Sequence, residues 1–244
     1  MPEKTYFEVI RQVLQKVEDT QKENIRKAAG LIADALATGK MLYTFGTGHS
    51  SLLAMEPFYR AGGFARVNPI LKEDLLLNKN ASQSSVKERE AGIGKKIIDS
   101  RKCTKGDVLL VMSNSGRNCV PVEAAIEAKS HEMKVIAITS MSHSIISRPR
   151  NPYNKRLFEV ADVVIDNCGA KGDASLEDKE TGIKFAPTST AAGTVIIWEI
   201  VRIAICKMEE KGIRPELFMS ANIDGGDEYN KALIEKYRFE VPSL

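Results

Sequence analysis

The apolar positions of this chain follow two patterns, short continuous runs and helical spacings. Continuous runs predict buried strands at 41–45, 64–70, 107–112, 134–139 and 162–166. Between them, apolar residues at helical spacing predict helices at 50–60, 86–101, 120–131 and 188–211. Strands rich in Val, Ile and Leu that alternate with helices form parallel sheets covered on both faces. The pattern therefore predicts an α/β fold, a doubly wound parallel sheet.

The two ends of the chain also carry periodic segments. Residues 3–38 have helical spacing and stop at Gly39, but positions 19–23 are wholly polar, so we expect two helices or one kinked helix. A short strand at 217–221 and a helix at 227–237 close the chain. Because no repeat or low-complexity segment appears, we expect one domain. It would span 1–244, with a helical N-terminal extension at 3–38, an α/β core at 40–211 and a C-terminal tail at 212–244.

The longest apolar stretch covers residues 191–206. A membrane span needs about 20 mostly apolar residues, and Glu199 and Arg202 interrupt this one. We therefore interpret it as a buried helix and expect no membrane partner. Glu199 and Arg202 stand three positions apart, where they can pair on the helix surface.

Composition narrows the possible functions. The 244 residues include 35 Lys and Arg against 32 Asp and Glu, a net charge of +3, which argues against nucleic acid as a partner. The four cysteines form no C-x-x-C pair, which argues against a disulfide framework and a structural zinc site, and we expect no metal. Because the first residues contain no apolar signal core, we expect a cytoplasmic protein.

Polar, glycine-containing loops follow three of the predicted strands. They read GTGHSS at 46–51, SNSGRN at 113–118 and TSMS at 139–142. Ligands of parallel sheets bind at the carboxyl ends of the strands. Glycines there allow close backbone approach, and hydroxyls and helix N-termini bind anions without Lys or Arg. Each loop alone also fits an ordinary helix cap or turn, but three at one edge favour a phosphate site.

Nucleotide cofactors fit these loops less well. Gly46 and Gly48 begin a G-x-G-x-x-G pattern, but Ser51 stands where the third glycine is needed. The strand at 66–70 contains no acidic residue for a ribose, and there is no P-loop motif. We therefore expect no cofactor.

Four segments resemble the SIS (sugar isomerase) domain family. They are 46–51 (GTGHSS), 111–116 (VMSNSG), 135–140 (VIAITS) and 187–194 (PTSTAAGT). The resemblance covers about residues 3–211 and extends in particular to uncharacterised bacterial single-SIS-domain proteins. Sedoheptulose 7-phosphate isomerase and N-acetylmuramic acid 6-phosphate etherase are more distant. The resemblance to the SIS family implies a flavodoxin-like sheet, a sugar phosphate as ligand, and a homodimer or homotetramer with sites completed across an interface.

The same resemblance implies which residues bind the ligand. Ser113 and Ser115 would hold the phosphate with Asn118, a position where relatives often carry Thr. The residues expected to contact the phosphosugar are Gly46, Gly48, Ser50, Ser51, Ser113, Asn114, Ser115, Gly116, Asn118, Thr139 and Ser140.

Isomerising a sugar phosphate needs a carboxylate or histidine that moves a carbon-bound proton. Glu56 follows the first loop at a position that Pro57 kinks, and His49 lies two helical turns earlier. Glu88 or Glu90 in the polar helix is the next candidate, although acidic residues there also simply favour a helix start. Glu199 is the last, with Arg202 offering a structural explanation.

The loop at 140–157 is basic. No Asp or Glu occurs between Met133 and Phe158, so the loop could steer an anionic substrate to the sheet edge. The alternative is that the loop is a solvated face whose positive charges are balanced by the acidic segment 173–180. The polar stretch 78–85 could act as a lid.

Together these features favour an aldose–ketose sugar-phosphate isomerase that needs no cofactor. Two alternatives stay open. One is an etherase or lyase that acts on an amino-sugar 6-phosphate, and the other is a non-catalytic regulator that senses phosphosugars.

Overall fold

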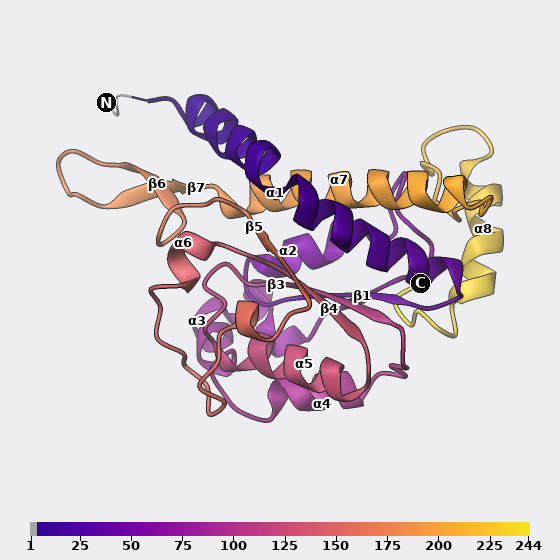
Figure 1. The fold of residues 1–244 in the computed structure, drawn as a ribbon, viewed down its shortest axis with the longest axis horizontal. Helices are drawn as coiled ribbons and strands as arrows, with labels where there is room; N and C mark the ends of the chain where they lie inside the picture. The colour runs from indigo at the N-terminus through magenta and orange to yellow at the C-terminus, as the bar shows by residue number, and fades with distance from the viewer. Residues whose placement is uncertain (1–3) are drawn as a thin grey trace.

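Five parallel strands form the central sheet of the computed structural model, which describes residues 4–244 (Figure 1). Their order is β2-β1-β3-β4-β5. The strands are β1 (Leu42–Gly46), β2 (Val67–Ile70), β3 (Val108–Met112), β4 (Lys134–Thr139) and β5 (Val163–Asp166). This is the flavodoxin-like order, and it confirms the predicted doubly wound α/β fold. The order reverses between β1 and β3, which is the point where ligands bind in such sheets.

Helices cover both faces of the sheet (Figure 1). One face carries α1 (Tyr6–Ala37), α2 (Ser50–Met55) and α7 (Ser189–Glu210), and the other carries α4 (Ile93–Asp99) and α5 (Cys119–Ser130). The residues of β3 show how the core divides. Leu110 and Met112 are buried in the cluster under α1 and α7, whereas Leu109 and Val111 are buried in the cluster over α4 and α5. The continuous apolar run of this strand is thus explained by burial on both sides.

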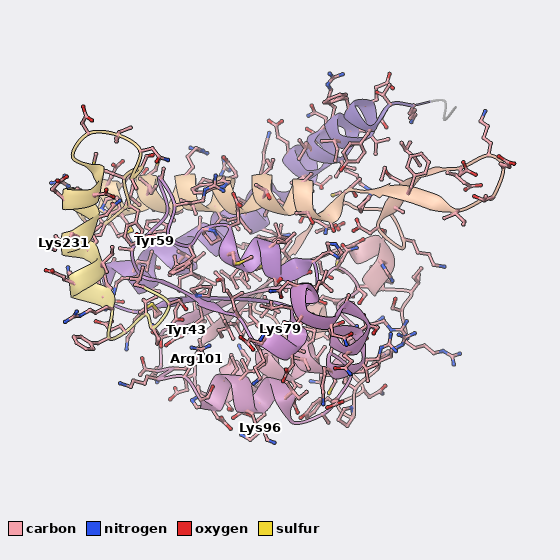
Figure 2. All side chains as sticks on the ribbon, turned by 180° about the vertical axis from the view of Figure 1, so that it is seen from behind. Tyr43, Tyr59, Lys79, Lys96, Arg101 and Lys231 are labelled. Carbon is pink, nitrogen blue, oxygen red and sulfur yellow. The ribbon has the colours of Figure 1, made fainter. Side chains whose placement is uncertain are left out.

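Shorter elements connect and extend these layers. They are η1 (Glu73–Leu75), α3 (Leu77–Lys87), α6 (Met141–Ser144), η2 (Leu157–Glu159), β6 (Ala174–Glu177), β7 (Lys184–Pro187) and α8 (Gly226–Tyr237). Seen from behind, Lys79 marks α3 beside the sheet, Lys96 marks α4 in the lower layer, and Tyr59 lies next to α8 (Figure 2). The β6–β7 hairpin and the first half of α1 project from the same side of the body (Figure 1). The Tyr6 hydroxyl, which donates to the Pro187 carbonyl at 2.6 Å, joins them.

The N-terminal segment is one continuous helix, so the prediction of two helices or a kink is wrong. Positions 18–27 stay helical because their exposed face carries pairs four residues apart, Glu18 with Lys22 and Glu23 with Lys27. The buried side chains of Val17 and Ile25 continue the apolar face on either side of the polar stretch.

Three other predicted elements differ in the structure. The helix at 86–101 is two helices, since Gly92 adopts φ +84° between α3 and α4. The helix after the first loop ends at Met55, just before Pro57. Stretch 78–85 lies within α3, and the strand at 217–221 is reduced to one isolated bridge between Phe64 and Leu217.

Helix α7 confirms the long apolar helix predicted at 188–211. By length and composition alone it could cross a membrane, a test that the core helices of globular folds also pass. Ile196, Ile200 and Ala204 are buried beneath α1, whereas the Val195 side chain on another face is 47% exposed. The helix is therefore a core element on one side only.

Candidate functional site

The first loop connects β1 to α2 by a very tight turn. A Cβ atom on Gly46 would lie 2.3 Å from the Ser50 carbonyl oxygen, so only glycine fits there. Gly48 adopts φ +54°, and its N–H donates to the Leu75 carbonyl at 2.9 Å. The Ser51 hydroxyl donates to the Gly48 carbonyl at 2.7 Å and so stabilises the turn. The Ser50 hydroxyl has no hydrogen bond within residues 4–244, which leaves it available to a ligand.

The second loop connects β3 to α5 and is held by the neighbouring strands. The Ser113 N–H donates to the Ile138 carbonyl at 3.1 Å. The Asn114 side-chain oxygen accepts from the Asn167 side-chain amide at 2.8 Å. The main-chain carbonyl of Asn114 accepts from the Thr139 hydroxyl at 3.2 Å. Asn114 therefore positions the loop. The hydroxyls of Ser113 and Ser115 make no side-chain hydrogen bond among the described residues.

The third loop packs directly against the second. Gly116 adopts φ +59°, and a Cβ there would lie 2.9 Å from the Ser144 hydroxyl and 3.1 Å from that of Thr139. The Ser140 hydroxyl donates to the Gly169 carbonyl at 2.7 Å. Thr139 and Ser140 thus hold the loops together, and the three loops that the sequence placed at one edge do meet there.

Unpartnered polar atoms concentrate at this edge. Among residues 4–244, seven buried side-chain nitrogen or oxygen atoms lack a hydrogen-bond partner. Four of the seven belong to the loops or helix starts at the carboxyl ends of the strands: Arg117 Nε, Asn118 Oδ1, Ser144 Oγ and Thr188 Oγ1. Buried polar groups are normally paired, so a concentration of free ones is typical of a site that binds a polar ligand.

Glu88 lies at the switch point between the first two loops. Its Oε1 accepts a hydrogen bond from the Thr47 hydroxyl at 2.6 Å, and its main-chain oxygen accepts from the Val120 N–H at 3.0 Å. The residue therefore contacts both the loop after β1 and the start of α5. Of the two glutamates that the sequence offered in this helix, the structure brings this one to the loops. Glu90 instead pairs with Lys87 at 2.9 Å, with 44% of its side chain exposed.

The other proton-transfer candidates lie in different surroundings. Glu56 stands at the far end of α2, where it accepts from the Trp198 indole N–H at 2.7 Å and pairs with Arg60 at 2.6 Å. His49 immediately precedes α2 on the first loop and is exposed. His49 therefore lies at the loops, whereas Glu56 does not.

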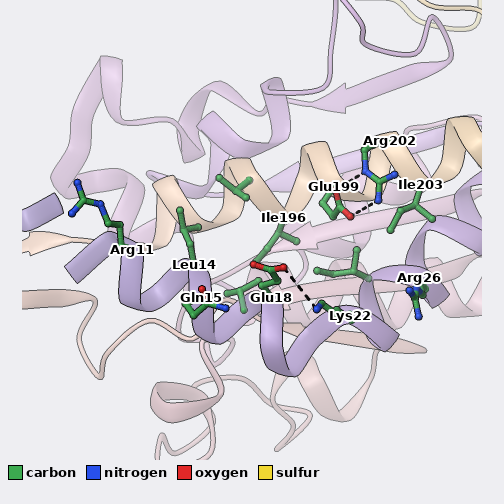
Figure 3. Close-up of a pocket in the computed structure, with 13 residues that line it drawn as sticks. Arg11, Leu14, Gln15, Glu18, Lys22, Arg26, Ile196, Glu199, Arg202 and Ile203 are labelled. Carbon is green, nitrogen blue, oxygen red and sulfur yellow. Dashed lines mark hydrogen bonds and ion pairs between the residues drawn. The ribbon is translucent and has the colours of Figure 1, made fainter. Parts of the chain in front are cut away.

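Glu199 lies in a groove between α1 and α7 (Figure 3). It forms the predicted pair with Arg202 at 2.6 Å, and hydrogen bonds from that guanidinium lower the pKa of its carboxyl. A half-exposed carboxylate that is already paired has a structural explanation, and the structure does not bring Glu199 to the three loops at the carboxyl ends of the strands.

His143, which the sequence placed in the basic loop, lies in α6 beside the second loop. Its Nδ1 accepts from the Gly172 N–H at 3.2 Å. Burial, together with the positive charges of Arg117 and Lys171, lowers the pKa of the imidazole. With Nδ1 as acceptor, the neutral ring carries its proton on Nε2.

Sequence reasoning missed Thr47, Asn167 and Thr188. Thr188 belongs to the segment 187–194 that carried the family resemblance, and Asn167 follows β5 directly, so the rule that strand ends carry ligands could have found both. Thr47 becomes evident only through its contact with Glu88.

A group of metal-ligand type occurs on the far layer, where Asp99, Glu127 and His131 gather on α4 and at the end of α5. The Lys95 ammonium lies 3.0 Å from the Asp99 carboxylate and 2.8 Å from that of Glu127. Since this cation already pairs with both carboxylates, the group is explained as a surface ion-pair network.

The strand order and the three converging loops define a flavodoxin-like α/β domain with a candidate ligand site at its switch point. A family model described as SIS domain matches residues 5–140. The UPF0309 protein of Geobacillus thermodenitrificans is 41% identical over 98% of this chain and 96% of its own. That of Caldanaerobacter subterraneus subsp. tengcongensis is 44% identical over 98% of both chains. The chain belongs to the UPF0309 proteins within the SIS domain family.

Solved structures share the fold at low sequence identity. A phosphoheptose isomerase from Francisella tularensis is 18% identical, with a TM-score of 0.52 over 82% of this chain and 94% of that one. The sugar isomerase domain of an RpiR transcription factor from Sphaerobacter thermophilus is 16% identical, with a TM-score of 0.50 over 96% of both chains. At these identities the likeness shows the fold alone.

Proposed function

We propose that this protein binds a sugar phosphate at the β1–β3 switch point and interconverts its aldose and ketose forms. The observation that carries the proposal is the position of Glu88. Its carboxylate is hydrogen-bonded to Thr47 on the first loop, and its main chain is bonded to the start of α5 behind the second loop. A carboxylate beside two anion-binding loops is the arrangement that proton transfer on a sugar phosphate requires.

The phosphate would be bound by the free hydroxyls of Ser113, Ser115 and Ser50, together with the backbone around Gly116. Helix α5 begins at Cys119 and runs for 12 residues, so its N-terminus adds a favourable dipole to the same region. This phosphate site needs no Lys or Arg side chain. This explains how a chain with a net charge of only +3 can be specific for an anion.

The chemistry assigned to Glu88 is the transfer of one proton between adjacent carbons. The carboxylate removes the proton from C2 of the aldose, the C–H electrons form the C1–C2 double bond, and the carbonyl oxygen takes up a proton. Return of the proton to C1, with loss of the proton from the C2 hydroxyl, gives the ketose. The Thr47 hydroxyl holds the carboxylate in place, and His49 lies on the same loop to exchange protons with the sugar oxygens.

A thermal-shift screen of hexose, heptose and amino-sugar phosphates tests binding. The double variant Ser113→Ala, Ser115→Ala should lose the stabilisation that the ligand gives to the wild type. Ser130→Ala is the matched control, since that hydroxyl caps the end of α5 at the opposite edge of the sheet. Unchanged ligand shifts in the double variant would refute the phosphate assignment.

Product analysis then separates the classes of function. Interconversion of aldose and ketose supports the isomerase. Loss of a substituent with incorporation of oxygen from water points to an etherase or lyase, and binding without turnover points to a sensor. These last two outcomes keep the phosphate site and overturn the reaction.

We also propose that the chain forms a homodimer through the α1–α7 groove. The groove has a volume of about 760 Å³, and Leu14, Val195 and Ile203 provide its apolar lining (Figure 3). Charges of both signs border it, among them Arg26 and Glu18. A two-fold axis brings the same patch of each copy together, and a surface that carries both signs can complement itself.

A further inference from the structure

Three arginines from different segments come together at the start of α5. Arg117 follows Gly116 in the second loop. The Arg150 N–H donates to the Arg117 carbonyl at 2.8 Å, and Arg150 also pairs with Asn118 in an isolated parallel bridge. Arg89 follows Glu88, whose carbonyl accepts from the first turn of α5. The sequence left open whether the basic loop steers an anionic substrate or is a solvated face, and in the structure the main chain of Arg150 is bonded to the second loop.

These three guanidinium groups have no acidic partner. Among the described residues, none of them forms an ion pair or a side-chain hydrogen bond, and Arg117 Nε is buried without a partner. Other arginines of the chain are paired, for example Arg156 with Glu159 and Arg202 with Glu199. Three cations gathered without a counter-charge repel one another, so their arrangement favours an anion from outside the chain.

The buried carboxylate of Glu123 on α5 has other partners than the three arginines. Glu123 on α5 is 3% exposed, and its two oxygens accept from the N–H groups of Gly92 and Gly94 at 2.9 and 2.8 Å. Glu123 Oε1 also accepts from the Tyr153 hydroxyl at 2.7 Å. The carboxylate is therefore committed to holding the α3–α4 turn and the basic loop in place. Among the described residues, Glu123 makes no hydrogen bond or ion pair with Arg89, Arg117 or Arg150.

The electrostatics of the region agree with this geometry. Burial and the charges of Arg150 and Arg89 lower the pKa of Arg117, and the charge of Arg117 contributes to the lowered pKa of His143. Arg117 and His143 therefore sense one positive field beside the second loop. A planar guanidinium binds carboxylate or phosphate oxygens through paired N–H donors, which a hydroxyl loop cannot do.

We propose that Arg117, Arg150 and Arg89 form a second anion subsite, so that the ligand is a sugar phosphate with a further carboxylate or phosphate. The proposal rests on the proposed function, because the serine loops hold the first phosphate. The subsite defines the substrate class. The serine hydroxyls bind the phosphate of any sugar phosphate, and the arginines select the sugar phosphates that carry a second anionic group.

Calorimetric titration with two matched pairs of ligands tests the subsite. The pairs are fructose 6-phosphate with fructose 1,6-bisphosphate, and glucose 6-phosphate with 6-phosphogluconate, all at one ionic strength. In at least one pair, the wild type should bind the member with the second anionic group about tenfold or more tightly than the monophosphate, as expected for charge-assisted hydrogen bonds. The pair that shows the preference distinguishes a second phosphate from a carboxylate.

The variant Arg117→Gln, Arg150→Gln should lose that preference and keep its affinity for the monophosphates within about twofold. Lys134→Gln removes the same kind of charge at the amino end of β4, the opposite edge of the sheet, and should retain the preference. Equal wild-type affinity within both pairs overturns the subsite alone. An equal loss of affinity for both members of each pair in the double variant also overturns it, because the arginines would then bind the first phosphate. If the wild type binds none of these four ligands and none of the heptose or amino-sugar phosphates of the thermal-shift screen, the proposed function fails with it.

Discussion

The Thr47 hydroxyl donates a 2.6 Å hydrogen bond to the Glu88 carboxylate, joining residues 41 positions apart in the chain. One partner lies in the loop after β1 and the other at the end of α3. The contact places an acceptor-only side chain next to the loops that the sequence had marked for phosphate. It also distinguishes Glu88 from Glu90, which lies two residues away and is paired with Lys87 at the surface.

Replacing Glu88 by Gln should lower turnover of the preferred sugar phosphate by about 100-fold or more, because the amide cannot accept the carbon-bound proton. Ligand binding, measured by thermal shift, should persist since the amide oxygen can still accept from Thr47. Glu90→Gln, the matched neighbour, should keep turnover near that of the wild type. Loss of activity in Glu90→Gln with retention in Glu88→Gln would reverse this assignment.

Replacing Gly116 by Ala should disrupt the second loop. A left-handed backbone costs a non-glycine residue about 1–2 kcal/mol. The new methyl group would also lie 2.9 Å from the Ser144 hydroxyl and 3.1 Å from that of Thr139. Gly172→Ala separates the two effects, because φ there is +79° and no atom lies within 4 Å of the added Cβ. Urea unfolding should show a larger loss of stability for Gly116→Ala, together with weaker phosphosugar binding. Equal losses for the two variants would mean that the packing of this loop is unimportant.

The free energy of unfolding should depend on pH through His143. Its pKa in the folded protein is below the ordinary value of 6.5, so the unfolded chain binds more protons than the folded one between these two values. Stability should therefore be fully present above about pH 6.5 and fall as the pH drops through 6.5 toward the folded pKa. In His143→Asn this component of the pH dependence should be absent.

An NMR titration of His143 provides a direct check. Arg117→Gln removes one of the positive charges beside the imidazole, so the pKa of His143 should rise toward its ordinary value. A pKa unaffected by this substitution would show that the charge of Arg117 does not contribute to the shift.

Replacing Val195 by Asp should dissociate the proposed homodimer. Val195 lies in the α1–α7 groove with 47% of its side chain exposed, so the charge harms the interface more than the fold of one copy. Light scattering after size-exclusion chromatography should show a mass near 26.9 kDa for the variant and twice that for the wild type. Val86→Asp is the control, as Val86 lies on α3 with 57% exposure outside the groove. A monomeric wild type would remove this proposal.

Local patterns in the sequence determined the layers of this protein. Runs such as Val108–Met112 are apolar at every position because the strand is covered on both sides. Such a strand can be predicted from the local sequence, without knowledge of the segments that pack against it. The glycines and hydroxyls of 46–51 and 113–118 likewise predicted the edge of the sheet where we propose that the ligand binds. Turns that bring a backbone close to a ligand demand these residue types wherever they occur.

Only the tertiary structure decided which side chains meet at that edge. The order β2-β1-β3 brings the two serine loops together, and the turn at Gly92 allows α3 to end with Glu88 against Thr47. Spacing along the chain could not choose between Glu88 and Glu90, because the partner that distinguishes them, Thr47, lies on another element. The sequence also could not predict that Arg117 is unpaired, because the absence of a counter-charge depends on all the segments that pack around a residue.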